Sequence, residues 1–303
     1  MENIINRINK VMQKGNRFLI LIIALCVLVV LSSLYVFIFG GNKRGTGVPA
    51  TQATVTENGD ELIISDLYSG QLTIPKFSYP VNTYKSESFT VEADGTISYP
   101  NAHLGIDVSE HQGDVDWAQV SAAGYKYALI RAGYRGYTRG RTYDDSTFEA
   151  NMKGATENGL KVGIYFFSQA VTVAEAEEEA SFILQMIGDY KIDYPIVFDW
   201  ENVDDTAART NGLDGETVTQ LAAAFCDKIK KAGYNTAVYL NKSQMYGFYN
   251  LDKLKGFDLW YAEYQNKPSQ YYDFTIWQYT STATVPGIEG TVDVNISFKN
   301  YTK

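Results

Sequence analysis

The chain has 303 residues, enough to bury a sizeable core in one or two domains, and its 23 tyrosines lift the aromatic share to 14%. The formal net charge of −9 argues against binding to a nucleic acid backbone, which requires clustered Lys and Arg, and we find no nucleic-acid motif. The two cysteines, Cys26 and Cys226, are too few for a disulfide scaffold or a cysteine zinc site, and two irregularly spaced histidines predict no metal site, so we expect neither metal nor cofactor.

An apolar stretch near the N-terminus predicts a membrane anchor. Residues 18–40 hold no charged side chain, and a helix of that length, at about 1.5 Å per residue, spans a hydrocarbon core of about 30 Å. The stretch is longer than the apolar region of a signal peptide, and no A-x-A cleavage site follows it. We therefore expect an uncleaved, single-pass transmembrane helix that contacts the lipid bilayer.

The basic residues around this stretch predict its orientation. Four precede it within residues 1–17, and two, Lys43 and Arg44, follow it. The positive-inside rule then places residues 1–17 in the cytoplasm and everything after about residue 41 outside the bacterial cell membrane.

Residues 41–100 predict an extracellular linker with a small β stalk. Residues 41–60 are polar, with Gly, Pro and Thr and no apolar period, which is typical of a flexible tether. Residues 61–77 hold two β-prone runs around a Ser-Gly turn, and residues 88–100 repeat this pattern around Asp94-Gly95. We interpret these hairpins as a stalk or minor β-element, and we find no candidate catalytic or binding residues in them.

From about residue 101 to residue 303, strands alternate with helices. Three segments share a helix tail, then a glycine suited to the left-handed position past a helix end, and then an apolar strand run; these glycines are Gly124, Gly159 and Gly233. Such alternation predicts a parallel sheet with both faces covered. We count eight strand runs: 104–109, 127–132, 162–168, 195–200, 236–241, 257–262, 274–279 and 291–295.

Eight strands in about 200 residues predict an α/β fold, namely an irregular β/α (TIM-like) barrel with reduced helices. The last helices are expected to be missing, because the final three strand runs follow one another too closely. This barrel, residues 101–303, is the expected catalytic domain.

Two acids, Asp199 and Glu201, follow the apolar run at 195–198. Residues two apart on a strand face the same side, so both carboxylates point away from the side of Trp200. At the carboxyl end of a barrel strand that side opens into the active site. Paired carboxylates there can divide labour, one ionised and one protonated, as cleavage of a glycosidic bond requires. The alternative, that the acids merely end the strand and cap the next helix, stays open for this pair alone.

Two further acids lie on other strands. Asp107 ends the first run and Asp293 lies on the last. Acids that end three strands of one barrel converge on one mouth, where their mutual repulsion is costly unless function retains it.

Other side chains at strand ends are candidates for substrate binding, with barrel packing as the alternative role; they are Tyr165, Tyr239, Trp260, Trp277 and Gln278. Arg131, a sixth candidate for substrate binding, follows Tyr-Ala-Leu-Ile in the second strand run and either pairs with one of the acids or forms a structural ion pair. His111 lies close enough in sequence to Asp107 to hydrogen-bond near it.

Five motifs together resemble one known family, glycoside hydrolase family 25: LGIDVSEHQGDVDW, YFFSQA, IVFDWE, LWYAEY and WQYTSTATVPGIEGTVDVN, within residues 102–301. These Chalaropsis-type lysozymes are N-acetylmuramidases of bacterial peptidoglycan. The resemblance implies an irregular β/α barrel and cleavage of the β-1,4 bond after N-acetylmuramic acid with net retention. It also implies that Glu201 is the proton donor and that Asp199 is either the nucleophile or the carboxylate that orients the substrate's acetamido group. Asp107 and Asp293 would complete the acidic ring.

Two motifs depart from the family pattern. Many members read His-Trp-Gln where this chain has residues 110–112, Glu-His-Gln, and His-Phe-Ala-Arg where it has residues 166–169, Phe-Phe-Ser-Gln. These departures affect the expected subsite preference. We hypothesise a membrane-anchored muramidase that acts on peptidoglycan glycan strands in wall remodelling. The alternatives are a catalytically silent wall-binding protein on the same scaffold and a chitinase-like hydrolase.

Overall fold

The computed structural model describes residues 55–301. The expected transmembrane helix at 18–40 and most of the expected linker lie outside the described residues. Within 55–301, no helix combines the length and apolar character needed to span a bilayer.

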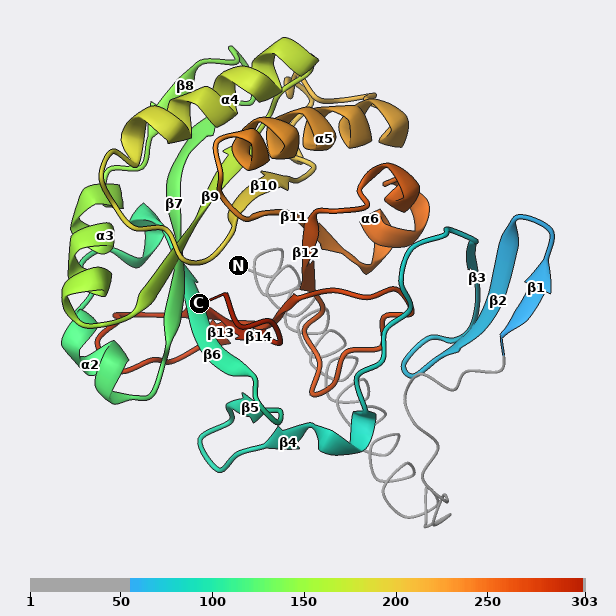
Figure 1. The fold of residues 1–303 in the computed structure, drawn as a ribbon, viewed down its shortest axis with the longest axis horizontal. Coiled ribbons are helices and arrows are strands. Elements are labelled where there is room, and N and C mark those ends of the chain that lie inside the picture. Colours follow the sequence, from blue (N-terminus) through green and yellow to red (C-terminus); the bar gives the residue numbers. More distant parts are fainter. Residues whose placement is uncertain (1–54, 302–303) are drawn as a thin grey trace, which may run out of the picture. The chain divides into compact units, whose positions relative to one another are not determined.

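Eight strands close into a barrel, as the sequence predicts (Figure 1). They follow the order β6-β14-β13-β12-β11-β10-β9-β7, and β7 returns to pair with β6. Their bounds are β6 (His103–Val108), β7 (Tyr127–Arg135), β9 (Lys161–Ser168), β10 (Ile196–Trp200), β11 (Thr236–Asn241), β12 (Asp258–Ala262), β13 (Ile276–Ala283) and β14 (Val292–Ser297). A short strand, β8 (Thr142–Asp144), pairs antiparallel with the end of β7.

The last strand departs from the expected parallel arrangement. β14 runs antiparallel to both of its neighbours, β13 and β6. Residues 284–291, which connect β13 to β14, form a hairpin loop, whereas a parallel crossover requires a dozen residues or more. The expectation that Asp293 ends its strand is therefore wrong, because this residue lies near the start of β14. The antiparallel direction nevertheless brings that start to the mouth where β6 ends.

Four helices cover the outside of the barrel (Figure 1): α2 (Trp117–Ala122), α3 (Phe148–Glu157), α4 (Val173–Met186) and α5 (Gly215–Lys231). The connections after β11 carry only the short α6 (Lys242–Gly247) and a 3-10 turn, η3 (Leu251–Lys253), which confirms the reduced helices. Two more 3-10 turns, η1 (Ser86–Ser88) and η2 (Glu110–Gln112), precede β6 and follow it.

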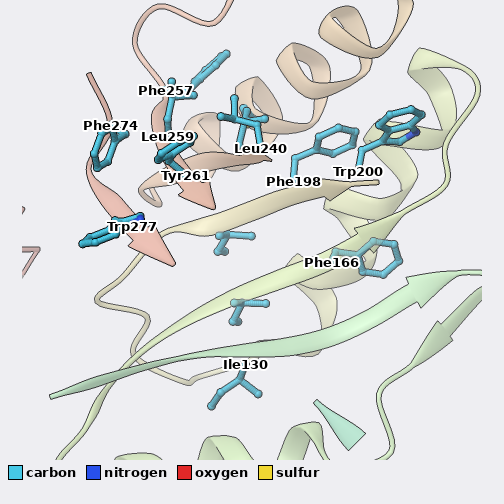
Figure 2. Close-up of a cluster of buried hydrophobic side chains, with 14 of the residues drawn as sticks. Ile130, Phe166, Phe198, Trp200, Leu240, Phe257, Leu259, Tyr261, Phe274 and Trp277 are labelled. Atoms are coloured by element: carbon cyan, nitrogen blue, oxygen red, sulfur yellow. The ribbon is translucent and has the colours of Figure 1, made fainter. Parts of the chain in front are cut away.

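Alternation along β10 separates the core from the site. Phe198 and Trp200 point outward (Figure 2). The ring of Phe198 lies 5.4 Å from the ring of Phe225 on α5, and Trp200 stacks on Phe248 at 5.2 Å. Asp199 has the opposite parity and faces the barrel interior. On the side of Asp199 away from the mouth, an apolar cluster fills the interior of the barrel. It includes Tyr127, Leu129, Tyr194, Val197, Ala237, Ile276 and Tyr301. The barrel interior on the side of Asp199 away from the mouth is therefore packed with apolar side chains.

Residues 56–98 form two small antiparallel sheets that include both predicted hairpins. One contains β1 (Thr56–Asn58), β2 (Glu61–Asp66) and β3 (Gly70–Pro75), and the other contains β4 (Thr90–Val91) and β5 (Ile97–Ser98). Both pack on the barrel and do not project as a stalk. The hydroxyl of Tyr272 donates to the carbonyl of Pro75 at 2.5 Å, and the ring of Phe89 meets Trp277 edge-on at 5.5 Å. The described residues form one compact unit.

Candidate active site

Four carboxyl groups line one cavity of about 280 Å³ at the mouth of the barrel: Asp107, Asp199, Glu201 and Asp293. They come from the end of β6, from the end of β10 and the residue after it, and from the start of β14. Of the six predicted substrate-binding residues, five line the same cavity: Arg131, Tyr165, Tyr239, Trp260 and Gln278. Within residues 55–301, no group of three or more His, Cys, Asp and Glu side chains is arranged to hold a metal ion.

Two amide side chains hold Asp107 in place. Its Oδ2 accepts from Nε2 of Gln278 at 2.9 Å and from Nδ2 of Asn295 at 2.7 Å. Gln278 and Asn295 are partners in the β13–β14 register, so the two donors arrive side by side. Burial, followed by the negative charge of Asp293, raises the pKa of Asp107 well above its usual value, while the two amides act in the opposite direction.

The aromatic wall of the cavity is tied to Asp107 through the same amides. Oε1 of Gln278 accepts from the hydroxyls of Tyr239 and Tyr264, each at 3.1 Å. The indole nitrogen of Trp260 donates to Oδ1 of Asn295 at 2.7 Å. These hydrogen bonds fix the aromatic rings as well as the carboxylate, and a fixed aromatic surface with polar edges suits a sugar.

Asp199 and Glu201 have the environment of an acid and base pair. The Asp199 side chain is buried, and its Oδ1 has no hydrogen-bond partner among the described residues. Burial, and then the charge of Glu201, raise the pKa of Asp199 well above its usual value. Burial, and then the charge of Asp293, raise the pKa of the half-buried Glu201. Desolvation and crowding of like charges thus favour a protonated carboxyl in this pair, which can serve as a general acid.

Two glutamines hold the backbone that carries Glu201. Nε2 of Gln244, at the start of α6, donates to the carbonyl of Trp200 at 3.1 Å. Nε2 of Gln169, just after β9, donates to the carbonyl of Glu201 at 2.9 Å, and its Oε1 accepts from the hydroxyl of Thr210 at 2.8 Å. These contacts fix the backbone of Trp200, the last residue of β10, and of Glu201, which follows it.

Arg131 pairs with residues other than the four acids. Its Nε donates to Oδ2 of Asp145 at 2.7 Å and its Nη2 to Oε1 of Glu110 at 3.1 Å. The structural ion pair, one of the two expected roles, is therefore the one that forms. Burial acts to raise the pKa of Asp145, but backbone donors and the charge of Arg131 hold it below its usual value. The same charge acts to lower the pKa of Asp199, against the larger effect of burial.

Trp277, the sixth predicted substrate-binding residue, lies outside the cavity. It neighbours Gln278 in sequence and so faces the other side of β13, where its indole nitrogen donates to the carbonyl of Glu263 at 2.9 Å. Its ring packs on Phe89 and Tyr279. Trp277 therefore has the packing role that was its alternative.

Five further residues of the site were not predicted from the sequence: Ser109, Gln112, Phe167, Tyr264 and Asn295. Asn295 lies two positions after Asp293 on the same strand face, a spacing from which it could have been found. Tyr264 lies in the loop after β12, where no periodic signal marks it. His111, the remaining candidate, lines the cavity, with its Nε2 3.5 Å from Nη1 of Arg131.

Comparison with known proteins gives consistent matches. The family model described as Glycosyl hydrolases family 25 matches residues 106–288. The autolytic lysozyme of Clostridium acetobutylicum is 30% identical over 195 residues, which cover 63% of this chain and 54% of the relative. Lysozyme M1 of Streptomyces globisporus is 29% identical over 204 residues, covering 63% of this chain and 66% of the relative. The modular autolysin LytC of Streptococcus pneumoniae is similar in structure, with a TM-score of 0.59 and 25% sequence identity. The match covers 80% of this chain and 58% of the LytC chain. The chain thus spans about half to two thirds of the length of these relatives.

Proposed function

The chain belongs to glycosyl hydrolases family 25, and we propose that it is a muramidase that hydrolyses the β-1,4 bonds between N-acetylmuramic acid and N-acetylglucosamine in bacterial peptidoglycan. The observation that carries this proposal is the gathering of Asp107, Asp199, Glu201 and Asp293 around one cavity walled by tyrosine and tryptophan. The names of two relatives, an autolytic lysozyme and Lysozyme M1, point to the same activity.

In the proposed mechanism Glu201 protonates the oxygen of the departing sugar and later accepts a proton from water. Its raised pKa supports this role, because it favours the protonated form. Asp199 either attacks the anomeric carbon or orients the acetamido group of the substrate. Its Oδ1, which has no hydrogen-bond partner within residues 55–301, leaves an acceptor for either role. Asp107 and Asp293 complete the acidic ring around the substrate.

The cellular placement is part of the proposal. Residues 18–40 anchor the protein in the bacterial membrane, residues 1–17 face the cytoplasm and the barrel faces the wall, where the enzyme remodels glycan strands. The uncharged run and the excess of basic residues before it support this placement. Fractionation of cells tests it: the full chain sediments with membranes and is released only by detergent, whereas release by salt or alkali contradicts the anchor.

Digestion of two polymers tests the activity. The full chain is incubated in detergent with purified peptidoglycan and with chitin, and the fragments are analysed by mass. Reducing ends at muramic acid support the proposal. Binding to peptidoglycan without products indicates a silent wall-binding protein, and products from chitin indicate a chitinase-like hydrolase.

A further inference from the structure

A second cavity, of about 460 Å³, shares Tyr264 as a wall with the cavity that holds the acids. One of its sides is formed by the turn between β4 and β5, residues 94–96, together with Ile97 at the start of β5. Another side is formed by β13 and the loop after β12. The turn precedes residue 106, where the family match begins. A segment outside the matched family region therefore helps to build a hollow next to the catalytic mouth.

Tyr264, the shared wall, is well placed to hold a ligand that occupies both cavities. Its side chain is among the exposed large hydrophobic groups, with 53% of its surface accessible. Its hydroxyl nevertheless donates to Gln278 at 3.1 Å, and Gln278 in turn donates to Asp107 at 2.9 Å. The hydroxyl of Tyr264 is thus held by the hydrogen bonds that link Gln278 to Asp107, while its ring remains accessible.

The β4–β5 turn is anchored to the barrel. Ile97 is buried, and its N–H donates to the hydroxyl of Tyr279 on β13 at 3.4 Å. Within the turn, the N–H and hydroxyl of Thr96 both donate to Oδ1 of Asp94, at 2.9 and 2.7 Å. The turn is a formed wall, which a binding site requires.

The lining has the chemistry of a sugar site. Three tyrosines, Tyr125, Tyr264 and Tyr279, supply aromatic surface, and Asp94 is the one charged side chain on the described lining. Neutral polar groups complete it: the side chains of Gln265, Asn266 and Thr284 form no hydrogen bond with any other residue of the described 55–301. Aromatic faces beside unengaged amide and hydroxyl groups suit a neutral saccharide, whereas the carboxylates of a peptide stem would require basic partners.

We propose that this second cavity is an additional sugar subsite, which binds a further residue of the glycan strand beyond those held at the four acids. The inference rests on the proposed function, since it assigns the ligand of the neighbouring cavity to the same strand. It predicts that long glycans are better substrates than short ones, and that the advantage depends on the β4–β5 side of the mouth.

The test uses the full chain in detergent with glycan oligomers free of stem peptides, a tetrasaccharide and an octasaccharide. Thr284→Trp fills the second cavity at an exposed position, and Asn266→Ala removes one of the free amides. Thr83→Trp, at an exposed position that lines none of these cavities, is the matched control. We expect kcat/KM for the octasaccharide to fall about tenfold in Thr284→Trp and less in Asn266→Ala, a tenfold loss being about 1.4 kcal/mol. Tetrasaccharide turnover and the control stay unchanged.

Equal losses for both oligomers, or no loss for either, would overturn the subsite. An effect of Thr284→Trp seen only with glycan that bears stem peptides would overturn the sugar assignment and indicate a peptide ligand. Failure of the proposed function has a different signature, because the unaltered chain would then cleave neither oligomer. In that case binding of the two oligomers still tests the subsite, which predicts tighter binding of the octasaccharide and loss of that advantage in Thr284→Trp.

Discussion

Asp293 on β14 lies directly opposite Asp107 on β6 in the register of the closed barrel. The pairing exists because β14 enters the barrel antiparallel, so that its start meets the end of β6. Burial raises the pKa of both side chains, and the charge of Asp293 raises that of Asp107 further. Two carboxyl groups from distant parts of the chain are thus desolvated side by side. This arrangement favours retention of a proton by the pair.

The pH dependence of activity should follow Glu201. The proposed acid must be protonated, and burial raises its pKa, so activity persists above the ordinary glutamate pKa of about 4.3 and falls as pH rises through the value in the folded protein. A profile of kcat/KM against pH measures this basic limb. A limb that falls near the ordinary glutamate value would contradict the proposed environment of Glu201.

Asp199→Asn should stabilise the fold while it abolishes activity. The raised pKa means that the folded state favours the protonated form, so the carboxyl destabilises the fold increasingly as pH rises above the ordinary aspartate value. Replacing it with a neutral amide should add about 1 kcal/mol at neutral pH, or about 2–4 °C in Tm, and the gain should vanish at low pH. Thermal unfolding at pH 3 and pH 7 tests this, and a loss of stability at pH 7 would contradict it.

Asp145→Asn provides the contrast, because Asp145 is also buried but is paired with Arg131 at 2.7 Å. Its pKa is lowered, so its contribution to stability is present above the ordinary aspartate pKa and is lost as pH falls through the folded value. We expect this variant to lose stability at pH 7 and to approach the unaltered protein in acid. Thermal unfolding at pH 3 and pH 7 shows whether the variant is less or more stable than the unaltered protein. A gain in stability at pH 7 would refute the pairing of Asp145 with Arg131.

The sequence was sufficient to predict the eight strands and the convergence of the acids, because both follow from alternation and from apolar runs. The direction of β14 was missed, since an isolated strand of this kind reads the same whether it runs parallel or antiparallel. Trp277 was misplaced because the run that holds it is buried on both faces, which gives no pattern to tell the inside from the outside. The roles of Gln169 and Gln244 depend on backbone carbonyls across the barrel, which no local pattern reveals.

Gln169→Met should lower kcat more than it changes KM. The variant keeps the size of the side chain but cannot donate to the carbonyl of Glu201, so the acid loses its fixed position. Misplacement of a catalytic group by about 1 Å can cost about 100-fold, and we expect a loss of about 10–100-fold. The basic limb of the pH profile should also move, which a purely structural role would not cause.

Gln185→Met, at an exposed position on α4, serves as the control for this variant. Equal kinetics for Gln169→Met and the control would show that the carbonyl contact does not position Glu201.

Asp66→Ala should loosen the β2–β3 hairpin from the barrel. Asp66 is buried and accepts from Nζ of Lys242 and from Oγ of Ser269, both at 2.8 Å, and Lys242 also pairs with Glu263 at 2.6 Å. Removing one member of a buried pair costs about 3–5 kcal/mol, and the partial exposure of Lys242 places the expected loss at or below about 3 kcal/mol. Thermal unfolding and limited proteolysis of the hairpin measure it. Asp60→Ala, at an exposed position, is the control, and equal stability of the two variants would contradict the link.

The most direct measurement is peptidoglycan digestion by the unaltered chain and by Glu201→Gln, with mass analysis of the products and Glu289→Gln, at an exposed position, as control. The glutamine keeps the shape of the side chain but has no acidic proton to transfer, and general acid–base catalysis contributes about 10²–10⁴-fold. We predict reducing ends at muramic acid from the unaltered chain and the control, and a loss of that order in Glu201→Gln. Full turnover by Glu201→Gln would contradict the central claim that the carboxyl at the end of β10 delivers the proton.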